Sequence, residues 1–133
     1  MRRTLDTNIC SYILRRHPAS MIERFAALER DQVWLSAIVA SELRFGAVKL
    51  ASPRFSAAVE RWLSGFDVRP WPVQATHSYA QIRCALESAG KPIGAMDLLI
   101  AAHAMAEDSV IVTNNAREFL RVPGLAVQEW AID

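Results

Sequence analysis

Residues 92–106 read Pro92-Ile93-Gly94-Ala95-Met96-Asp97-Leu98-Leu99-Ile100-Ala101-Ala102-His103-Ala104-Met105-Ala106. After Gly94 the segment predicts a helix that is apolar on every side, and such a helix is normally buried inside a domain. Asp97 is its only formally charged residue. Because an unpaired carboxylate is costly to remove from water, this acid requires hydrogen-bond donors, a cation or a chemical role. Capping by the free amides of the first helical turn is the alternative explanation.

The length and composition predict one globular domain spanning residues 1–133. Hydrophobic residues make up 52% of the chain, yet no apolar run approaches the roughly 20 residues of a membrane span. The segment from Met1 to Asp6 is not followed by the apolar core of a signal peptide, so we expect a cytoplasmic protein. Cys10 and Cys84 show no metal-ligand spacing, and we expect both thiols to be buried.

The charge balance says little about a nucleic-acid partner, because the net charge is only +1. The type of basic residue is more informative, since thirteen of the fifteen Lys and Arg residues are Arg. The planar guanidinium group suits bidentate contacts with phosphate, which favours a phosphate-bearing partner. A solvated surface explains these arginines equally well.

Short apolar segments alternate with helical patterns along the chain, and turn or capping residues separate them. Gly90 is the expected end signal of the longest helix. The alternation predicts a three-layer α/β/α sandwich with a short-stranded, mostly parallel sheet. We expect strands over residues 4–5, 33–35, 66–69, 109–113 and 125–128, and helices over 6–15, 19–30, 36–48, 53–65, 73–89, 95–106 and 116–120.

Three acids are expected to meet at one edge of this sheet, where ligands of open parallel sheets bind. Asp6 directly follows the first strand, while Glu42 and Asp97 lie near the beginnings of helices that must pack on the sheet. Crowded carboxylates need a cation, and hard oxygen ligands suit Mg²⁺ or Mn²⁺ rather than zinc. Such a site can activate water and clamp a phosphodiester oxygen, giving 5′-phosphate and 3′-hydroxyl ends.

Four segments of the chain resemble, in order, the motifs of PIN-domain ribonucleases and, more narrowly, of the VapC toxins of type II toxin–antitoxin pairs. The resemblance covers nearly the whole chain and implies a PIN-like fold. It implies a Mg²⁺-dependent endoribonuclease that cuts structured RNA, often transfer RNA, with a VapB-type antitoxin as partner and a homodimer as the assembly. The four segments are Leu5-Asp6-Thr7-Asn8-Ile9, Ser41-Glu42-Leu43-Arg44-Phe45-Gly46, residues 93–104, and Val112-Thr113-Asn114-Asn115-Ala116-Arg117-Glu118-Phe119.

The resemblance also implies which residues act. Asp6, Glu42 and Asp97 match the catalytic acids of the family, and Asp6 and Asp97 match its metal ligands. Residues beside these acids are candidates for accessory roles or, in the case of the arginines, for contacts with RNA phosphates. The accessory candidates are Thr7, Asn8, Asn115 and Glu118, and the phosphate-binding candidates are Arg44 and Arg117.

Two departures from the family pattern bear on the site. Many PIN domains carry another acid in the turn after the fourth strand, where this chain has Asn115, and an Asn cannot neutralise a cation. Glu118 is the candidate to supply that charge, unless it pairs with Arg121 on the short helix. The first strand, which includes Arg2 and Arg3, is also more polar than the resemblance leads us to expect.

Other functions remain open from the sequence. A PIN-like module that has lost catalysis could act by binding RNA or protein. Cleavage of DNA also remains open, because hydrolysis by a metal-activated water does not require a 2′-OH. A phosphate-handling enzyme with Asp6 as nucleophile normally needs a second acid two residues on, where this chain has Asn8. His103 is expected to be a buried structural residue. The candidates for an apolar groove that receives a partner helix are Ile9, Tyr12, Phe25, Phe55 and Trp62.

Overall fold

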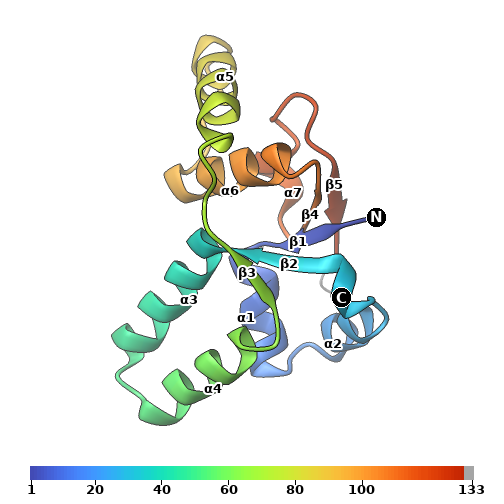
Figure 1. Ribbon diagram of the computed structural model, residues 1–133, viewed down its shortest axis with the longest axis vertical. Helices are drawn as coiled ribbons and strands as arrows, with labels where there is room; N and C mark the ends of the chain where they lie inside the picture. The colour runs from blue at the N-terminus through green and yellow to red at the C-terminus, as the bar shows by residue number, and fades with distance from the viewer. Residues whose placement is uncertain (131–133) are drawn as a thin grey trace.

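The computed structural model describes residues 1–130, and its centre is a five-stranded parallel sheet (Figure 1). The strand order is β3-β2-β1-β4-β5, so the first strand lies in the middle. Every pair of neighbouring strands in this sheet is parallel, which confirms the predicted sheet. The strands are β1 (Arg3–Leu5), β2 (Val33–Ser36), β3 (Asp67–Arg69), β4 (Val110–Thr113) and β5 (Val127–Glu129).

Helices cover both faces of the sheet, as the predicted sandwich requires (Figure 1). The chain moves outward from β1 to β3 and then returns across β1 to β4, so right-handed crossovers place the later helices on the opposite face. One layer holds α1 (Thr7–Arg15), α2 (Ala19–Ala26), α3 (Ala37–Leu50) and α4 (Pro53–Leu63), and the other holds α5 (Ala75–Ser88), α6 (Ala95–Ala106) and α7 (Ala116–Phe119). No helix in residues 1–130 is long and apolar enough to cross a membrane.

Most element boundaries lie within two residues of the prediction, and two of the differences have a physical reason in the structure. The helix expected over 19–30 ends at Ala26, and a short 3-10 helix, Arg30–Gln32, turns the chain into β2. The last strand begins at Val127 rather than residue 125, because Gly124 adopts a positive φ of 80° and Leu125 still donates to the Val122 carbonyl within the turn. In both places the pattern of apolar residues extends beyond the helix or strand, into a segment where the chain turns.

The two cysteines also differ from each other. Cys10 is fully buried, as expected, but the prediction for Cys84 is wrong because its side chain is exposed. Helix α5 packs against α6 through one side only, which includes Ile82 and Leu86, and Cys84 lies on the solvent side. One-sided packing of this kind leaves half of an amphipathic helix in water.

The core lies between the sheet and the two helical layers, and Leu35 of β2 is completely buried within it. We expect Leu35→Ala to lower the free energy of unfolding by about 3 kcal/mol, because it removes buried methyl groups and leaves a cavity. Urea denaturation measures this change. Leu120→Ala is the matched control, since Leu120 is 69% exposed and should cost under about 0.5 kcal/mol. Equal losses for the two variants would contradict this placement of the core.

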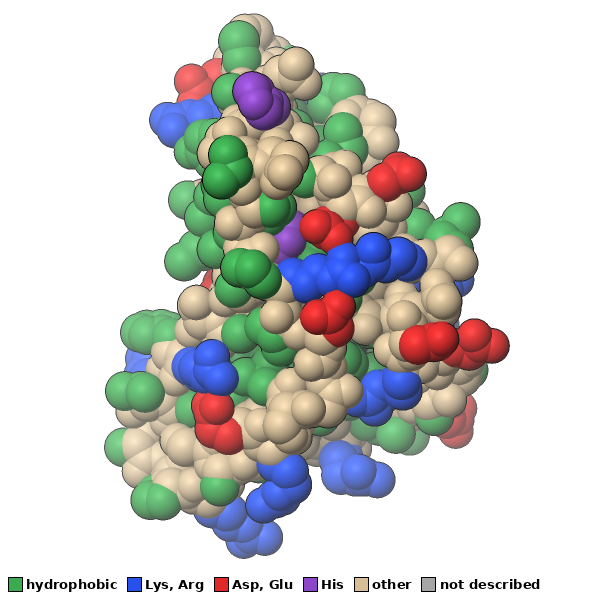
Figure 2. Space-filling model, viewed as in Figure 1, with side chains coloured by type: hydrophobic (Ala, Val, Ile, Leu, Met, Phe, Trp, Pro, Cys, Tyr) green, Lys and Arg blue, Asp and Glu red, His purple; other side chains and the backbone are tan. Residues whose placement is uncertain are grey.

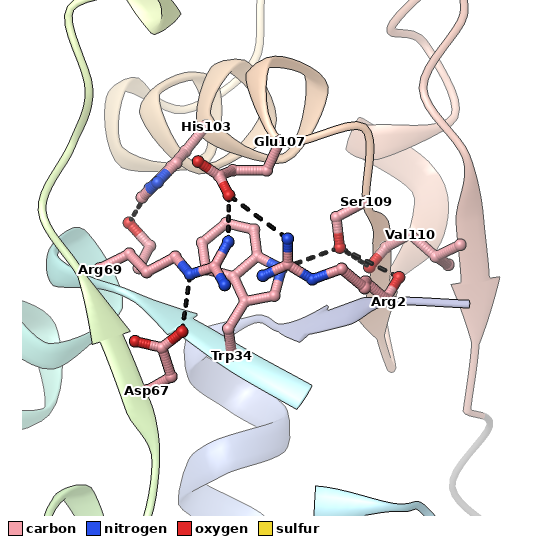
Figure 3. A network of polar contacts seen from close by, with 9 residues as sticks. Arg2, Trp34, Asp67, Arg69, His103, Glu107, Ser109 and Val110 are labelled. Atoms are coloured by element: carbon pink, nitrogen blue, oxygen red, sulfur yellow. Dashed lines mark hydrogen bonds and ion pairs between the residues drawn. The ribbon is translucent and has the colours of Figure 1, made fainter. Parts of the chain in front are cut away.

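A polar network fastens the C-terminal end of α6 to the sheet (Figure 3). Arg69 of β3 pairs with Asp67 at 2.8 Å and with Glu107, which follows α6, and its guanidinium lies 5.4 Å from the Trp34 ring centre. Arg2 reaches the same Glu107 carboxylate at 3.8 Å. Helix α6 spans about 18 Å at 1.5 Å per residue, so anchoring this end directs its other end to the carboxyl edge of the sheet.

His103 forms a second link between α6 and the sheet, as predicted for a buried structural residue. Its side chain is fully buried, its Nδ1 lies 2.8 Å from the Ser36 hydroxyl, and its ring lies 4.6 Å from the Trp34 ring. Burial lowers the pKa of the imidazole, so the ring is neutral. Because Ser36 also caps α3 by accepting from the Ile38 amide at 3.1 Å, this contact couples α6 to α3.

Candidate active site

Asp6 stands at the carboxyl end of the central strand, where β1 turns directly into α1. Its Oδ1 accepts a hydrogen bond from the Ile9 amide at 2.9 Å, which makes Asp6 the cap of α1. Its Oδ2 accepts from the Thr113 hydroxyl at 2.5 Å, and Thr113 is the last residue of the neighbouring strand β4. The side chain is only 6% exposed. Two adjacent strand ends therefore fix one buried carboxylate at the edge where we expect ligands.

Glu42 approaches the same edge from α3. The Thr7 hydroxyl, on the first residue of α1, donates a hydrogen bond of 2.6 Å to Glu42 Oε1. Glu42 is half-buried and lies in the second turn of α3, whose start is fixed by the cap at Ser36. Because Thr7 follows Asp6 directly, this bond ties the second acid to the first.

Asp97 and Glu118 form a carboxyl pair on the opposite side of the sheet. Asp97 lies in the first turn of α6 and shares a side-chain hydrogen bond with Glu118 of α7. Glu118 Oε1 also accepts from the Gly94 amide at 3.3 Å. A Cβ atom at Gly94 would contact Asp97 Oδ2 at 3.5 Å and Glu118 Oε2 at 3.8 Å. The glycine therefore leaves open space beside two carboxyl oxygens.

Burial and neighbouring acids raise the proton affinity of Asp97 and Asp6. Burial raises the pKa of Asp97 to about 7, and the hydrogen bond and charge of Glu118, followed by the charges of Asp6 and Glu42, act in the same direction. Burial also raises the pKa of Asp6, although the Thr113 hydrogen bond opposes this shift. The pKa of Glu118 falls because Asp97 donates to it. Of the two acids, Asp97 is therefore the one that carries the shared proton and Glu118 the one that accepts the hydrogen bond.

No arginine or lysine in residues 1–130 forms an ion pair with Asp6, Glu42, Asp97 or Glu118. Arg121 acts on Glu118 through its charge without forming an ion pair, so these carboxyl groups carry negative charge that no ion pair in the described residues compensates. A bound cation would favour their ionised forms and lower their pKa values.

The donor set fits a hard divalent cation by its chemistry, because every candidate ligand is an oxygen atom. Next to Thr113, the buried Oδ1 of Asn114 has no hydrogen-bond partner in the described part of the chain. Asp97 and Glu118 share a hydrogen bond, whereas Asp6 and Glu42 each accept one from a threonine hydroxyl. Within residues 1–130 no three His, Cys, Asp or Glu side chains are grouped closely enough to enclose an ion.

The remaining predicted residues lie around these acids with separate partners. The side chains of Asn8 and Asn115 are exposed and form no hydrogen bond within the described residues, while the Asn115 amide donates to the Thr113 hydroxyl at 3.0 Å. Arg44 makes a bidentate pair with Glu60, both bonds measuring 2.9 Å. Arg117 is exposed on α7. The roles of these four residues stay predictions.

Three residues of the site carry contacts that the sequence did not assign to them. Thr113 orients Asp6, and Gly94 leaves room beside Asp97. Glu129 of β5 accepts a hydrogen bond from the Ala116 amide at 3.3 Å, and so caps α7, for which Asn115 provides no side-chain cap. A Thr that closes the strand next to Asp6 is a usable sequence signal, whereas the contact of Glu129 depends on the register of β5 with β4.

We expect Thr113→Val to destabilise the protein by about 1.5–3 kcal/mol at pH 7, because the buried Asp6 carboxylate loses a hydroxyl donor. The same bond lowers the pKa of Asp6, so its loss raises that pKa further. The destabilisation is fully present above the folded-state pKa of Asp6 in the variant, which lies above the ordinary value. It shrinks as the pH falls through the folded-state pKa values of the two proteins, below which both carry a protonated Asp6. Denaturation at pH 7 and pH 3 measures the difference, and a loss that does not change with pH would contradict it.

Comparison with known proteins identifies the family of the chain. The PIN domain family model matches residues 4–125. The chain is 41% identical over 128 residues to the tRNA(fMet)-specific endonuclease VapC of Shigella flexneri, covering 96% of both chains, and 37% identical to ribonuclease VapC2 of Rickettsia felis, covering 95% and 96%. The crystal structure of DNA-bound VapBC from Salmonella typhimurium superposes with a TM-score of 0.91 at 39% identity, covering 98% and 99%. The chain belongs to the PIN-domain family and, within it, to the VapC ribonucleases.

Proposed function

We propose that this chain is the toxin of a type II toxin–antitoxin pair and that it is a metal-dependent endoribonuclease with Asp6, Glu42 and Asp97 as its catalytic acids. The observation that carries the proposal is that Asp6, Glu42, Asp97 and Glu118 approach the carboxyl edge of the sheet and none of them forms an ion pair within residues 1–130. Burial raises the pKa of Asp97 to about 7, and the neighbouring acids add to that shift. We take residues 1–133 as a single nuclease domain that acts on RNA in the cytoplasm.

Mg²⁺, with Mn²⁺ as a substitute, is the cofactor we propose, held by Asp6 and Asp97 with Glu118 nearby. When bound, the cation supplies activation of water and stabilisation of charge on a phosphodiester oxygen. Glu118 provides the negative charge that Asn115 lacks, since its hydrogen bond with Asp97 joins it to the acid pair. Arg121 lowers the pKa of Glu118 by its charge, but its guanidinium donates to the Pro92 carbonyl at 3.0 Å, so Glu118 faces Asp97 instead.

Glu42 is the residue we propose to accept a proton from the attacking water. Its Oε1 is held by the Thr7 hydroxyl at 2.6 Å, which fixes the orientation of the carboxyl plane. Its Oε2 is then available to a water molecule. Asp6, held by Ile9 and Thr113, serves as a fixed negative charge and does not need to move.

A VapB-type antitoxin is the proposed protein partner, since the solved relatives are VapBC complexes from Rickettsia felis and Salmonella typhimurium. Of the predicted groove residues, Phe25 and Trp62 line an apolar groove of about 450 Å³ between α1, α2 and α4, which suits a partner helix. Ile9 does not belong to this surface, because it is fully buried in the core. The exposed apolar side chains of Phe45 and Val48 on α3 are a surface for the proposed homodimer.

Incubation of the purified, antitoxin-free protein with total bacterial RNA and Mg²⁺ tests the function. We expect discrete fragments that carry 5′-phosphate and 3′-hydroxyl ends, which end-specific ligation and sequencing identify. The cut positions also name the RNA target, with transfer RNA as the first candidate. Cyclic phosphate ends would refute the proposed chemistry, and intact RNA would favour a PIN-like binding module.

A further inference from the structure

A cleft of about 370 Å³ opens beside the acids, between α1, α3 and the start of α4. Two helical stripes form its walls. Thr7, Ser11 and Arg15 recur every four residues along α1, and Glu42, Gly46 and Leu50 do so along α3. Leu43 and Phe55 complete the lining. Side chains four residues apart share one side of a helix, so both stripes face the same space.

The cleft is continuous with the proposed catalytic site, because Thr7 and Glu42 belong to both. Their hydrogen bond of 2.6 Å closes the end of the cleft at the carboxyl edge of the sheet. Arg15 lies eight residues further along α1, which is about 12 Å at 1.5 Å per residue. The cleft therefore leads away from the acids toward a cationic end.

Along the cleft the lining residues are first polar, at Thr7, Ser11 and Glu42, and then include apolar side chains and the cationic Arg15. Among the described residues, the Ser11 hydroxyl and the Arg15 guanidinium take part in no side-chain hydrogen bond or ion pair, so both groups can bind a ligand. Phe55 is half-buried and offers an aromatic surface beside Leu43. Grooves that bind single-stranded nucleic acid usually combine an aromatic ring, on which a base stacks, with a cationic side chain that binds the backbone phosphate. A hydroxyl such as that of Ser11 can also contact a ribose 2′-OH.

The surrounding charge favours the same ligand. Residues 7–63, which span the α1–α4 layer, contain eight Lys or Arg against five Asp or Glu. On the face shown in Figure 2, Lys and Arg side chains gather over the lower part of the molecule, where this layer lies in Figure 1. A positive field around the cleft attracts phosphates, although the acids at its inner end repel them.

Gly46 keeps the cleft open. A Cβ atom built at this position meets nothing within 4 Å, so the space beside it is empty. A glycine inside a helix is unfavourable for the helix itself. At this position the absence of a side chain preserves the width of the cleft in its middle.

We propose that this cleft is a subsite for single-stranded RNA, which binds the nucleotide next to the scissile phosphodiester. The base stacks on Phe55, and Arg15 holds the following phosphate. The inference rests on the proposed ribonuclease function. It assigns to this cleft the selection of an unpaired nucleotide beside the cut.

Two substitutions test the subsite, each with a matched control. Gly46→Leu fills the cleft and favours the helix, while Ala57→Leu adds the same side chain at an exposed position of α4 that does not line it. Arg15→Gln removes the cation, while Lys49→Gln removes one from α3 outside the cleft. The substrate is a synthetic single-stranded RNA with the sequence around the cut found in total RNA. Thermal melting checks that every variant folds.

We expect Gly46→Leu to raise the KM for this RNA on the order of tenfold, with a smaller change in kcat, because a stacked base is displaced. Arg15→Gln should lower the slope of log(kcat/KM) against log salt by about one, because one phosphate contact is lost. Wild-type KM values and salt slopes in both variants would overturn the subsite while the ribonuclease function stands, and would leave the cleft to a protein segment. A wild-type protein that cuts no RNA would remove the proposed function and the subsite together.

Discussion

Asp97→Asn is expected to abolish RNA cleavage, with kcat falling by about a thousandfold or more. The substitution keeps the shape of the side chain but removes its negative charge and the proton that it shares with Glu118. Without that charge the site loses one of its two proposed metal ligands, Asp6 and Asp97, and binds a divalent cation poorly. Single-turnover cleavage of the synthetic RNA at saturating protein measures the loss of the chemical step.

The stability of the same variant is the control, and its sign follows from the pKa of Asp97. That pKa is about 7 in the folded protein against an ordinary value of 3.8, so the unfolded chain loses this proton first as the pH rises. Ionisation therefore destabilises the metal-free fold between about pH 4 and pH 7. We expect Asp97→Asn to melt at a higher temperature than the wild type at pH 8 without metal. An inactive variant that is also less stable would indicate damage to the fold instead.

Removal of metal with EDTA is expected to abolish cleavage completely, and excess Mg²⁺ should restore it. The same addition should raise the melting temperature, because an ion that binds only the folded state stabilises it by about 2.7 kcal/mol at a hundred times its Kd. The rise should be larger at pH 8 than at pH 5, where protonation of Asp97 competes with the cation.

Asp97→Asn serves again as the comparison in this experiment, since it should show a smaller rise in melting temperature with Mg²⁺ than the wild type. Cleavage that persists in EDTA would exclude the metal-dependent mechanism. A Mg²⁺-dependent rise that is equal at both pH values would instead place the ion away from the Asp97 pair.

Much of the fold was predictable from the sequence, because each element carries its own local signal. The β-branched run before Thr113, the cap at Ser36 and the helix ending before Gly90 all behave as their residue types require. The apolar helix around Asp97 is buried as its composition indicates. The boundaries near Ala26 and Val127 were not predictable, because sheet register and a turn set them, and the local spacing does not.

The candidate site was predictable as a set of acids but not as a set of contacts. Asp6, Glu42 and Asp97 stand out because an acid at a strand end or in an apolar helix needs an explanation. Their partners come from distant segments, as Thr113 does for Asp6 at a separation of 107 residues. Pairings at that distance depend on which strands lie side by side, and only the strand order reveals them.

The central position of β1 also bears on how the protein is made. The first strand lies between β2 and β4, and the Asp6 carboxylate is completed by a residue near the end of the chain. A ribosome that has synthesised the first hundred residues has produced every proposed catalytic acid, but not the strand that holds Asp6 in place. The hydrogen bond that orients Asp6 can therefore form only after Thr113 has been added to the chain. The proposed site is thus completed late in synthesis, by a residue in the last fifth of the chain.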